Sequence, residues 1–111
     1  MTDGRLSSPL ALKRALKLVQ DKGVCFLVNK GRSLSLRVHT DSYMDAYHLE
    51  RTLGGGFYPF MAKGGRRYYV WSLMKREDLI AVYRGMVEAD LEIPPRLRWL
   101  AEFCVMILNN Q

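Results

Sequence analysis

Two segments of the chain combine clustered positive charge with the residue pattern of β-hairpins. Residues 24–39 and 54–75 contain seven lysines and arginines and no aspartate or glutamate. Lysine and arginine bind phosphate oxygens, and arginine can also donate two hydrogen bonds to a guanine edge in the major groove of DNA. A two-stranded β-ribbon fits that groove, so these segments predict nucleic-acid binding. The leading contacts are Lys30, Arg32, Arg37, Lys63, Arg66 and Arg67.

Aromatic residues in the second segment indicate a different kind of contact. Tyr68, Tyr69 and Trp71 could stack on bases if the bound nucleic acid were single-stranded. The structural alternative is that lysine and arginine keep solvated turns soluble while the aromatic side chains fill the core. For any single residue of these segments the structural alternative is favoured, and the case for binding rests on the pair of acid-free segments as a whole.

The composition is that of a soluble globular domain, with 49% apolar and 25% charged residues. A chain of 111 residues is long enough for one core, so we expect a single domain over residues 1–111. The net charge of +6 is unevenly spread, since the first 76 residues carry 14 bases and 5 acids and the rest carry 3 and 6. The surplus therefore predicts one basic face and a polyanionic partner.

The remaining composition argues against several other classes of protein. Cys25 and Cys104 are too few for a disulfide scaffold or a zinc framework, and they predict two buried thiols in a reducing compartment. His39 and His48 have no further ligands at zinc spacing, so we expect no metal and no other cofactor. The start of the chain lacks the pattern of a secretory signal, and the most apolar run is about half of a membrane span. We expect an intracellular, soluble protein, cytoplasmic or organellar, that is not secreted and has no membrane partner.

The elements that must position the basic residues follow from hydrophobic spacing and turn residues. The expected strands cover residues 24–29, 33–40, 57–62 and 68–73. The expected helices run from 8 to 23, from Thr40 or Asp41 to about 53, from about Ser72 toward the prolines at 94 and 95, and from about 96 to 108. This order predicts an α+β fold, with helices on one face of a four-stranded antiparallel sheet.

Details of the strands predict which side chains face outward. The strand at 33–40 alternates apolar and polar residues, so one face of the sheet is buried and the other is polar. That alternation places Arg37 on the polar face and makes it the strongest individual candidate. Pro59 predicts that its strand is an edge strand or is bulged there, because proline lacks the N–H that a central strand needs.

A faint internal repeat relates the two hairpins. Three pairs of identical residues are separated by 33 positions, namely Gly23 with Gly56, Lys30 with Lys63, and Gly31 with Gly64. Each repeat has a glycine before a basic hairpin, and a helix follows the hairpin, which indicates a shared architecture. Gly23 is expected to end the first helix because glycine can adopt a positive φ.

The junction between the first helix and the first hairpin resembles the motif of a known family. Residues 15–23 read ALKLVQDKG and are followed by Val24, Cys25 and Phe26. In LAGLIDADG homing endonucleases the motif helix ends in an acidic residue and a glycine, and the next strand commonly has a small residue and phenylalanine. Later segments are also similar: a TDS helix start, three glycines after the second helix, and a tyrosine-rich strand before a Glu-Asp-Leu helix. The resemblance implies a single-motif αββαββα fold, here with an extra C-terminal helix, that binds duplex DNA with its sheet.

One departure from the motif concerns catalysis. The resemblance places Lys22 where the family has an acid that holds a divalent metal at the scissile phosphate. Lysine cannot ligate Mg²⁺, which takes oxygen ligands, so we expect a degenerate motif without endonuclease activity. Asp21 is the one catalytic or metal-binding candidate, and only if the helix end shifts its register. Mg²⁺ would be required only if nuclease activity remains.

A second departure concerns assembly. Lys17 falls on the motif's central glycine, where the family's helices pack across a two-fold axis, and a lysine there would leave a buried charge unpaired. The C-terminal helix is apolar on most sides, which indicates either a different homodimer contact or burial in the core. Two alternative functions stay open: an RNA-binding module of maturase type, and an assembly or regulatory protein that dimerises through the C-terminal helix.

Overall fold

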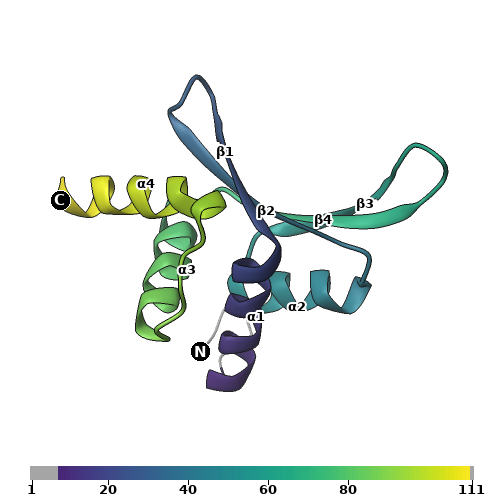
Figure 1. Cartoon of the computed structure of the whole chain (residues 1–111), viewed down its shortest axis with the longest axis horizontal. Coiled ribbons are helices and arrows are strands. Elements are labelled where there is room, and N and C mark those ends of the chain that lie inside the picture. The colour runs from purple at the N-terminus through teal and green to yellow at the C-terminus, as the bar shows by residue number, and fades with distance from the viewer. Residues whose placement is uncertain (1–7, 111) are drawn as a thin grey trace.

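Helices and a single antiparallel sheet make up the chain in the computed structural model, which describes residues 8–110 (Figure 1). The helices are α1 (Pro9–Lys22), α2 (Tyr43–Leu53), α3 (Arg76–Glu88) and α4 (Arg98–Asn109), with a short 3₁₀ helix at Pro95–Leu97. The strands are β1 (Gly23–Val28), β2 (Ser33–Thr40), β3 (Gly56–Met61) and β4 (Arg67–Leu73). The predicted α+β class, the element order and the extra C-terminal helix are confirmed.

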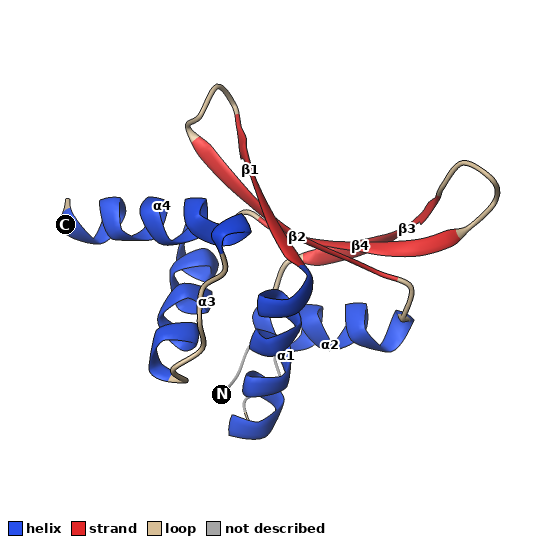
Figure 2. Ribbon diagram, viewed as in Figure 1, coloured by secondary structure: helices blue, strands red, loops and turns tan. Residues whose placement is uncertain are grey.

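The sheet has the strand order β1-β2-β4-β3, and each neighbouring pair is antiparallel. The two hairpins therefore meet through their second strands, β2 and β4, at the middle of the sheet. The helices gather on one side of the sheet, while the two hairpin turns rise away from them toward opposite ends (Figure 2). Pro59 lies in β3, which pairs only with β4, so the predicted edge strand is confirmed.

Local interactions explain where α1 begins and ends. The Ser8 hydroxyl accepts a hydrogen bond from the Ala11 N–H at 3.1 Å, and Pro9 occupies the first turn, as predicted. Gly23 follows the helix with φ −71° and ψ 145°, which is extended backbone, so the prediction of a positive φ is wrong. Glycine is needed here for a steric reason instead, because a Cβ at this position would lie 2.5 Å from the carbonyl oxygen of Val19. This close approach lets β1 start directly where α1 stops.

Two other helix starts differ from the prediction. The cap of α2 is Ser42, whose hydroxyl accepts from the Asp45 N–H at 3.1 Å, rather than Thr40 or Asp41. Helix α3 starts at Arg76, because Ser72 still belongs to β4 and pairs with Arg37 of β2. The strand β4 ends at Leu73, as predicted, and the Leu73 side chain is fully covered in the core.

The core lies between the helices and the inner face of the sheet. Leu34, Leu36 and Val38 of β2 alternate inward as predicted, and all three are completely buried. The indole N–H of the buried Trp71 donates to the Gly54 carbonyl at 2.8 Å, which ties the α2–β3 loop to the sheet. Among the described residues, sixteen buried side chains form the hydrophobic core: Ala15, Leu16, Val19, Leu34, Leu36, Val38, Leu49, Leu53, Trp71, Leu73, Leu79, Val82, Met86, Leu97, Leu100 and Cys104.

Helix α4 is only partly covered. Leu100 and Cys104 pack into the core, whereas Trp99, Val105 and Met106 are exposed on its outer side. Both alternatives for this helix therefore retain support, since one stripe is core and another stays open. Within residues 8–110 none of the helices is both long and apolar enough to cross a membrane.

Candidate nucleic-acid interface

One face of the sheet is turned away from the helices and is called the open face below. The strand register shows which of the predicted contact residues lie on this face. Side chains directly opposite each other in an antiparallel pair share a face, so the register assigns each residue to one side. The open face carries the side chains of Val24, Phe26, Val28, Ser33, Ser35, Arg37, His39, Tyr58, Phe60, Tyr68, Val70 and Ser72. The expectation of a uniformly polar face is wrong, because aromatic and aliphatic side chains occupy much of it.

Arg37 lies on the open face near the middle of the sheet, as the alternation predicted. Its strand, β2, pairs with β1 on one side and with β4 on the other. The Nε of Arg37 donates to the Ser35 hydroxyl at 3.1 Å, and its guanidinium lies 4.9 Å from the centre of the Phe26 ring. These contacts orient the guanidinium, whose two terminal nitrogens carry four further N–H donors. Arg37 is thus held in place with its donors available for a ligand.

The other leading bases lie at the hairpin turns rather than on the face. Lys30 and Arg32 are exposed in the β1–β2 turn, where Asn29, Lys30 and Gly31 adopt positive φ values of 53°, 58° and 84°. Lys63 and Arg66 are exposed in the β3–β4 turn. Because the two turns project toward opposite ends of the sheet (Figure 1), these bases form two separate basic tips and not one cluster.

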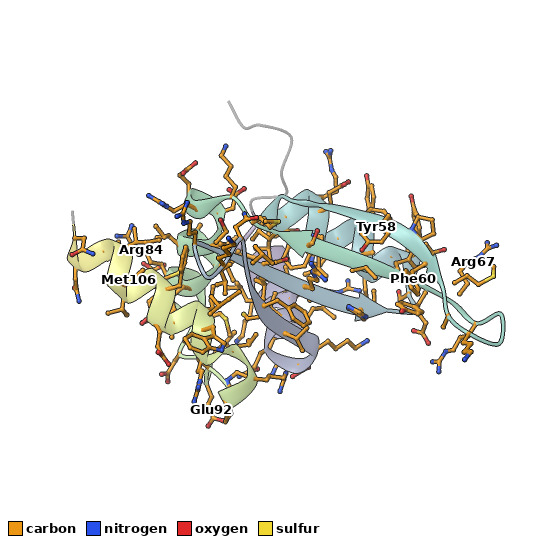
Figure 3. All side chains as sticks on the ribbon, turned by 90° about the horizontal axis from the view of Figure 1, so that it is seen from above. Tyr58, Phe60, Arg67, Arg84, Glu92 and Met106 are labelled. Carbon is orange, nitrogen blue, oxygen red and sulfur yellow. The ribbon has the colours of Figure 1, made fainter. Side chains whose placement is uncertain are left out.

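Two residues of the β3–β4 hairpin have a less direct relation to the open face. Arg66 forms an ion pair of 3.9 Å with Asp41, and both side chains are well exposed, so solvent screens the pair. Arg67 stands opposite Met61 in the register, which places its side chain on the same side of the sheet as the helices. It lies near the outer end of β4, beyond Phe60 (Figure 3).

The three aromatic residues proposed for stacking are divided between the two faces. Trp71 is fully buried in the core, so for this residue the favoured structural alternative is confirmed and stacking on bases is excluded. Tyr69 also faces the helices, where its ring meets Tyr43 edge-on at 5.6 Å. Tyr68 alone of the three lies on the open face.

Tyr68 is the centre of a group of rings that no pattern in the sequence had indicated. Its ring stacks on His39 at 5.6 Å with an interplanar angle of 21°, and lies 5.1 Å from Phe60 with an angle of 37°. His39 of β2, Tyr68 of β4 and Phe60 of β3 are called the aromatic row below. Tyr58 lies beside them on β3, where Figure 3 shows it with Phe60. The signal that could have found Phe60 and Tyr58 is the alternation of β3 once Pro59 is placed in it.

The end of α1, where the resemblance would place a metal, is a cationic site. Asp21 and Lys22 are exposed in its last turn. Arg96, from the segment before α4, donates through Nε to the Gly23 carbonyl at 2.8 Å and through Nη2 to the Gln20 carbonyl. Backbone oxygens that could have joined Asp21 around a cation are therefore already bound by a guanidinium. Among the described residues no three His, Cys, Asp or Glu side chains are grouped so that they could hold a metal ion.

The two cysteines are free thiols. Cys104 is buried as predicted, whereas Cys25 is only half-buried, so the prediction of two buried thiols is wrong for Cys25. Burial raises the pKa of Cys25 to about 11, and the nearby Cys104 adds to the rise. Burial likewise raises the pKa of Cys104 to about 11. Because the thiolate is the nucleophilic form, both residues are poor nucleophiles near neutral pH.

Comparisons of the chain with protein-family models, with curated proteins and with solved structures find no match. The likeness to the LAGLIDADG family therefore rests on the residues and the element order described above.

Proposed function

We propose that this chain binds duplex DNA with the open face of its sheet, as a member of a LAGLIDADG-like group that does not cut. The observation that carries the proposal is the position of Arg37, which is oriented at the centre of a sheet face that the helices leave uncovered. A basic tip flanks that face at each end, with Lys30 and Arg32 in one and Lys63 and Arg66 in the other.

The arrangement suits a groove of DNA. A major groove about 12 Å wide admits a two-stranded ribbon, because neighbouring strands are about 4.8 Å apart. In such a pose Arg37 would contact a guanine edge or a phosphate, and the partly exposed Ser33 would add a polar contact from the same strand, while the buried Ser35 supports Arg37 from beneath. The bases at the tips would neutralise phosphates on both sides of the groove.

The absence of cleavage is proposed from the end of α1. Lys22 occupies the position of the metal-binding acid, and Arg96 adds a second positive charge within hydrogen-bonding distance of the same turn. Two cations repel a divalent metal, which metal-assisted hydrolysis requires at the scissile phosphate.

A salt-titrated binding assay with duplex DNA tests the binding proposal. Affinity should fall steeply with added salt, and Arg37→Gln should weaken binding about tenfold. The matched control is Arg84→Gln, because Arg84 is exposed on α3 at the other end of the molecule from the β3–β4 turn (Figure 3). Equal losses of affinity for duplex DNA in Arg37→Gln and Arg84→Gln would show that Arg37 contributes no more to binding than a distant exposed arginine.

The cleavage question is decided in the same samples. Incubation with Mg²⁺ or Mn²⁺ should leave a supercoiled DNA substrate intact. Metal-dependent nicking that Asp21→Asn abolishes would refute the proposal that the motif is inactive.

RNA binding is the second candidate, and the aromatic row favours it. Rings on an open sheet face can stack on the unpaired bases that RNA loops present. Side-by-side titration with duplex DNA and with structured RNA separates the candidates by which ligand binds more tightly at equal salt. A stable dimer in light scattering without affinity for either would instead favour assembly through the exposed residues of α4, which are Trp99, Val105 and Met106.

A further inference from the structure

The two halves of the open face differ in chemistry. On the β1–β2 half, the Arg37 guanidinium covers the Phe26 ring and lies beside Ser35. On the β3–β4 half, Tyr58 and Phe60 are 50% and 45% exposed. The strand positions of that second half contribute no lysine or arginine to the open face, because Arg67 points to the other side. Contact with the phosphates and base edges of a regular duplex explains the guanidinium of the first half but does not explain the exposed rings of the second half.

The rings of the β3–β4 half are packed against one another before any ligand binds. Phe60 and Tyr68 are directly opposite in the register, and Tyr68 also stacks on His39. Val70 points to the same face but is only 3% exposed, although no helix covers that side. Its neighbours on the face therefore shield it, and they include Tyr58, which stands opposite it on β3. The result is an ordered aromatic surface that remains open to solvent.

A shallow pocket connects this surface to the basic tip of the same hairpin. Its volume is about 260 Å³, and it is lined by His39, Thr40, Asp41, Ala62, Arg66 and Tyr68. His39 and Tyr68 belong to the aromatic row, while Arg66 belongs to the tip. A ligand polymer in which flat rings alternate with phosphates could thus place one ring on the aromatic row and one phosphate beside Arg66.

Nucleic acid with unpaired bases has this chemistry. In a duplex each base is stacked on its neighbours and cannot offer a free face to a protein ring, whereas an unpaired base can. Stacking on exposed aromatic side chains is a general mode of binding to single strands, and it tolerates different base sequences.

We propose that the β3–β4 half of the open face binds unpaired bases, so that the target of this protein is a duplex joined to a single-stranded segment. This inference rests on the proposed function, since Arg37 and the β1–β2 half hold the duplex. The aromatic row stacks on one or two bases of the unpaired segment. Lys63 and Arg66, which contact duplex phosphates when the target is fully paired, contact the phosphates of the unpaired segment in a tailed target.

Three DNA probes test the inference with the full chain. The first is a blunt duplex, the second is the same duplex with a single-stranded tail of about six nucleotides, and the third has that tail paired with a complement. Fluorescence anisotropy at one fixed salt concentration gives the affinity for each. We expect the tailed probe to bind at least tenfold more tightly than either fully paired probe, because stacking of one base is worth about fivefold or more in affinity.

A double variant, Phe60→Leu with Tyr68→Leu, removes the rings but keeps apolar side chains over Val70. It should erase the preference for the tailed probe while leaving the affinity for the blunt duplex unchanged. The matched control is Tyr47→Leu, since Tyr47 is an exposed tyrosine on α2 that stacks on Tyr43 at 6.3 Å, away from the open face. A second measurement uses only the natural protein: 2-aminopurine in the tail should lose fluorescence on binding as it stacks.

The outcomes separate this inference from the proposed function. Equal affinity for the three probes, or an unchanged preference in a folded double variant, overturns the inference and leaves duplex binding in place. Unquenched 2-aminopurine in the bound complex also overturns it. Failure to bind any probe at low salt overturns both proposals together.

Discussion

The junction between α1 and β1 offers the sharpest test of how the fold is built. The change is Gly23→Ala, at the residue that ends the helix beside Lys22. A Cβ at this position would lie 2.5 Å from the Val19 carbonyl oxygen and 3.2 Å from Val19 Cγ1. The backbone cannot easily move aside, because Arg96 donates to the carbonyls of Gln20 and Gly23 on this same turn.

Two opposing effects set the magnitude. Replacing glycine with alanine stabilises a protein by about 0.4–1 kcal/mol where the backbone permits it, by restricting the unfolded chain. The extended conformation of Gly23 does permit alanine, so only the contact opposes the change. Forcing a methyl group into filled space costs about 1–3 kcal/mol, and a backbone atom at 2.5 Å favours the upper end. The net loss should be about 2 kcal/mol, or a fall of about 10 °C in Tm.

The internal repeat supplies a matched control, Gly56→Ala, 33 positions later. Nothing lies within 4 Å of a Cβ built on Gly56, and its φ is outside the left-handed region. This variant should be as stable as the natural chain or up to about 1 kcal/mol more stable. Urea unfolding followed by circular dichroism measures both. Free energies of unfolding within about 0.5 kcal/mol of each other would refute the steric account of Gly23.

Three further predictions concern other contacts of the fold. Trp71→Phe removes the indole N–H that bonds to a loop carbonyl and should lower the free energy of unfolding by about 2 kcal/mol in urea titration; an unchanged value would contradict the tie between loop and sheet. Arg96→Met keeps the aliphatic stem but frees two carbonyls at the end of α1, with an expected loss of about 1 kcal/mol, and an equally stable variant would show that those bonds contribute nothing. Burial raises the pKa of Cys25 and Cys104 from 9.0 to about 11 each, so above pH 9 the thiols ionise more readily in the unfolded chain than in the folded one. Their contribution to the free energy of unfolding is therefore complete below pH 9 and is lost as pH rises through 11. Urea midpoints should fall over that interval, and less steeply in the two Cys→Ala variants; identical slopes would exclude the thiols as the cause.

Local signals were sufficient to predict the elements of the fold. The Ser8–Pro9 start of α1 and the alternating apolar residues of β2 act within a few neighbours, so the sequence displays them directly. The edge position of β3 followed from Pro59 for the same reason. The antiparallel sheet then follows, because each hairpin is closed by a short turn.

The parts that could not be predicted depend on contacts between distant segments. Alternation along β4 separates Tyr68 from Tyr69 and Trp71, but only pairing with β2 and β3 decides which set faces the helices. The same register moves Arg67 off the open face. Arg96 reaches the end of α1 from 73 positions away along the chain, and no local pattern marks that contact.

The central claim is that the open face and its two basic tips bind the phosphates of duplex DNA, and the salt dependence of binding tests it most directly. Arg37 and the four bases at the tips, Lys30, Arg32, Lys63 and Arg66, would each neutralise one phosphate. Because each neutralised phosphate contributes about −0.9, a plot of log Kobs against log salt should have a slope of about −4 to −5. Arg37→Gln should reduce the steepness by about 1 if that residue contacts a phosphate. A slope near zero for the natural protein would contradict the account.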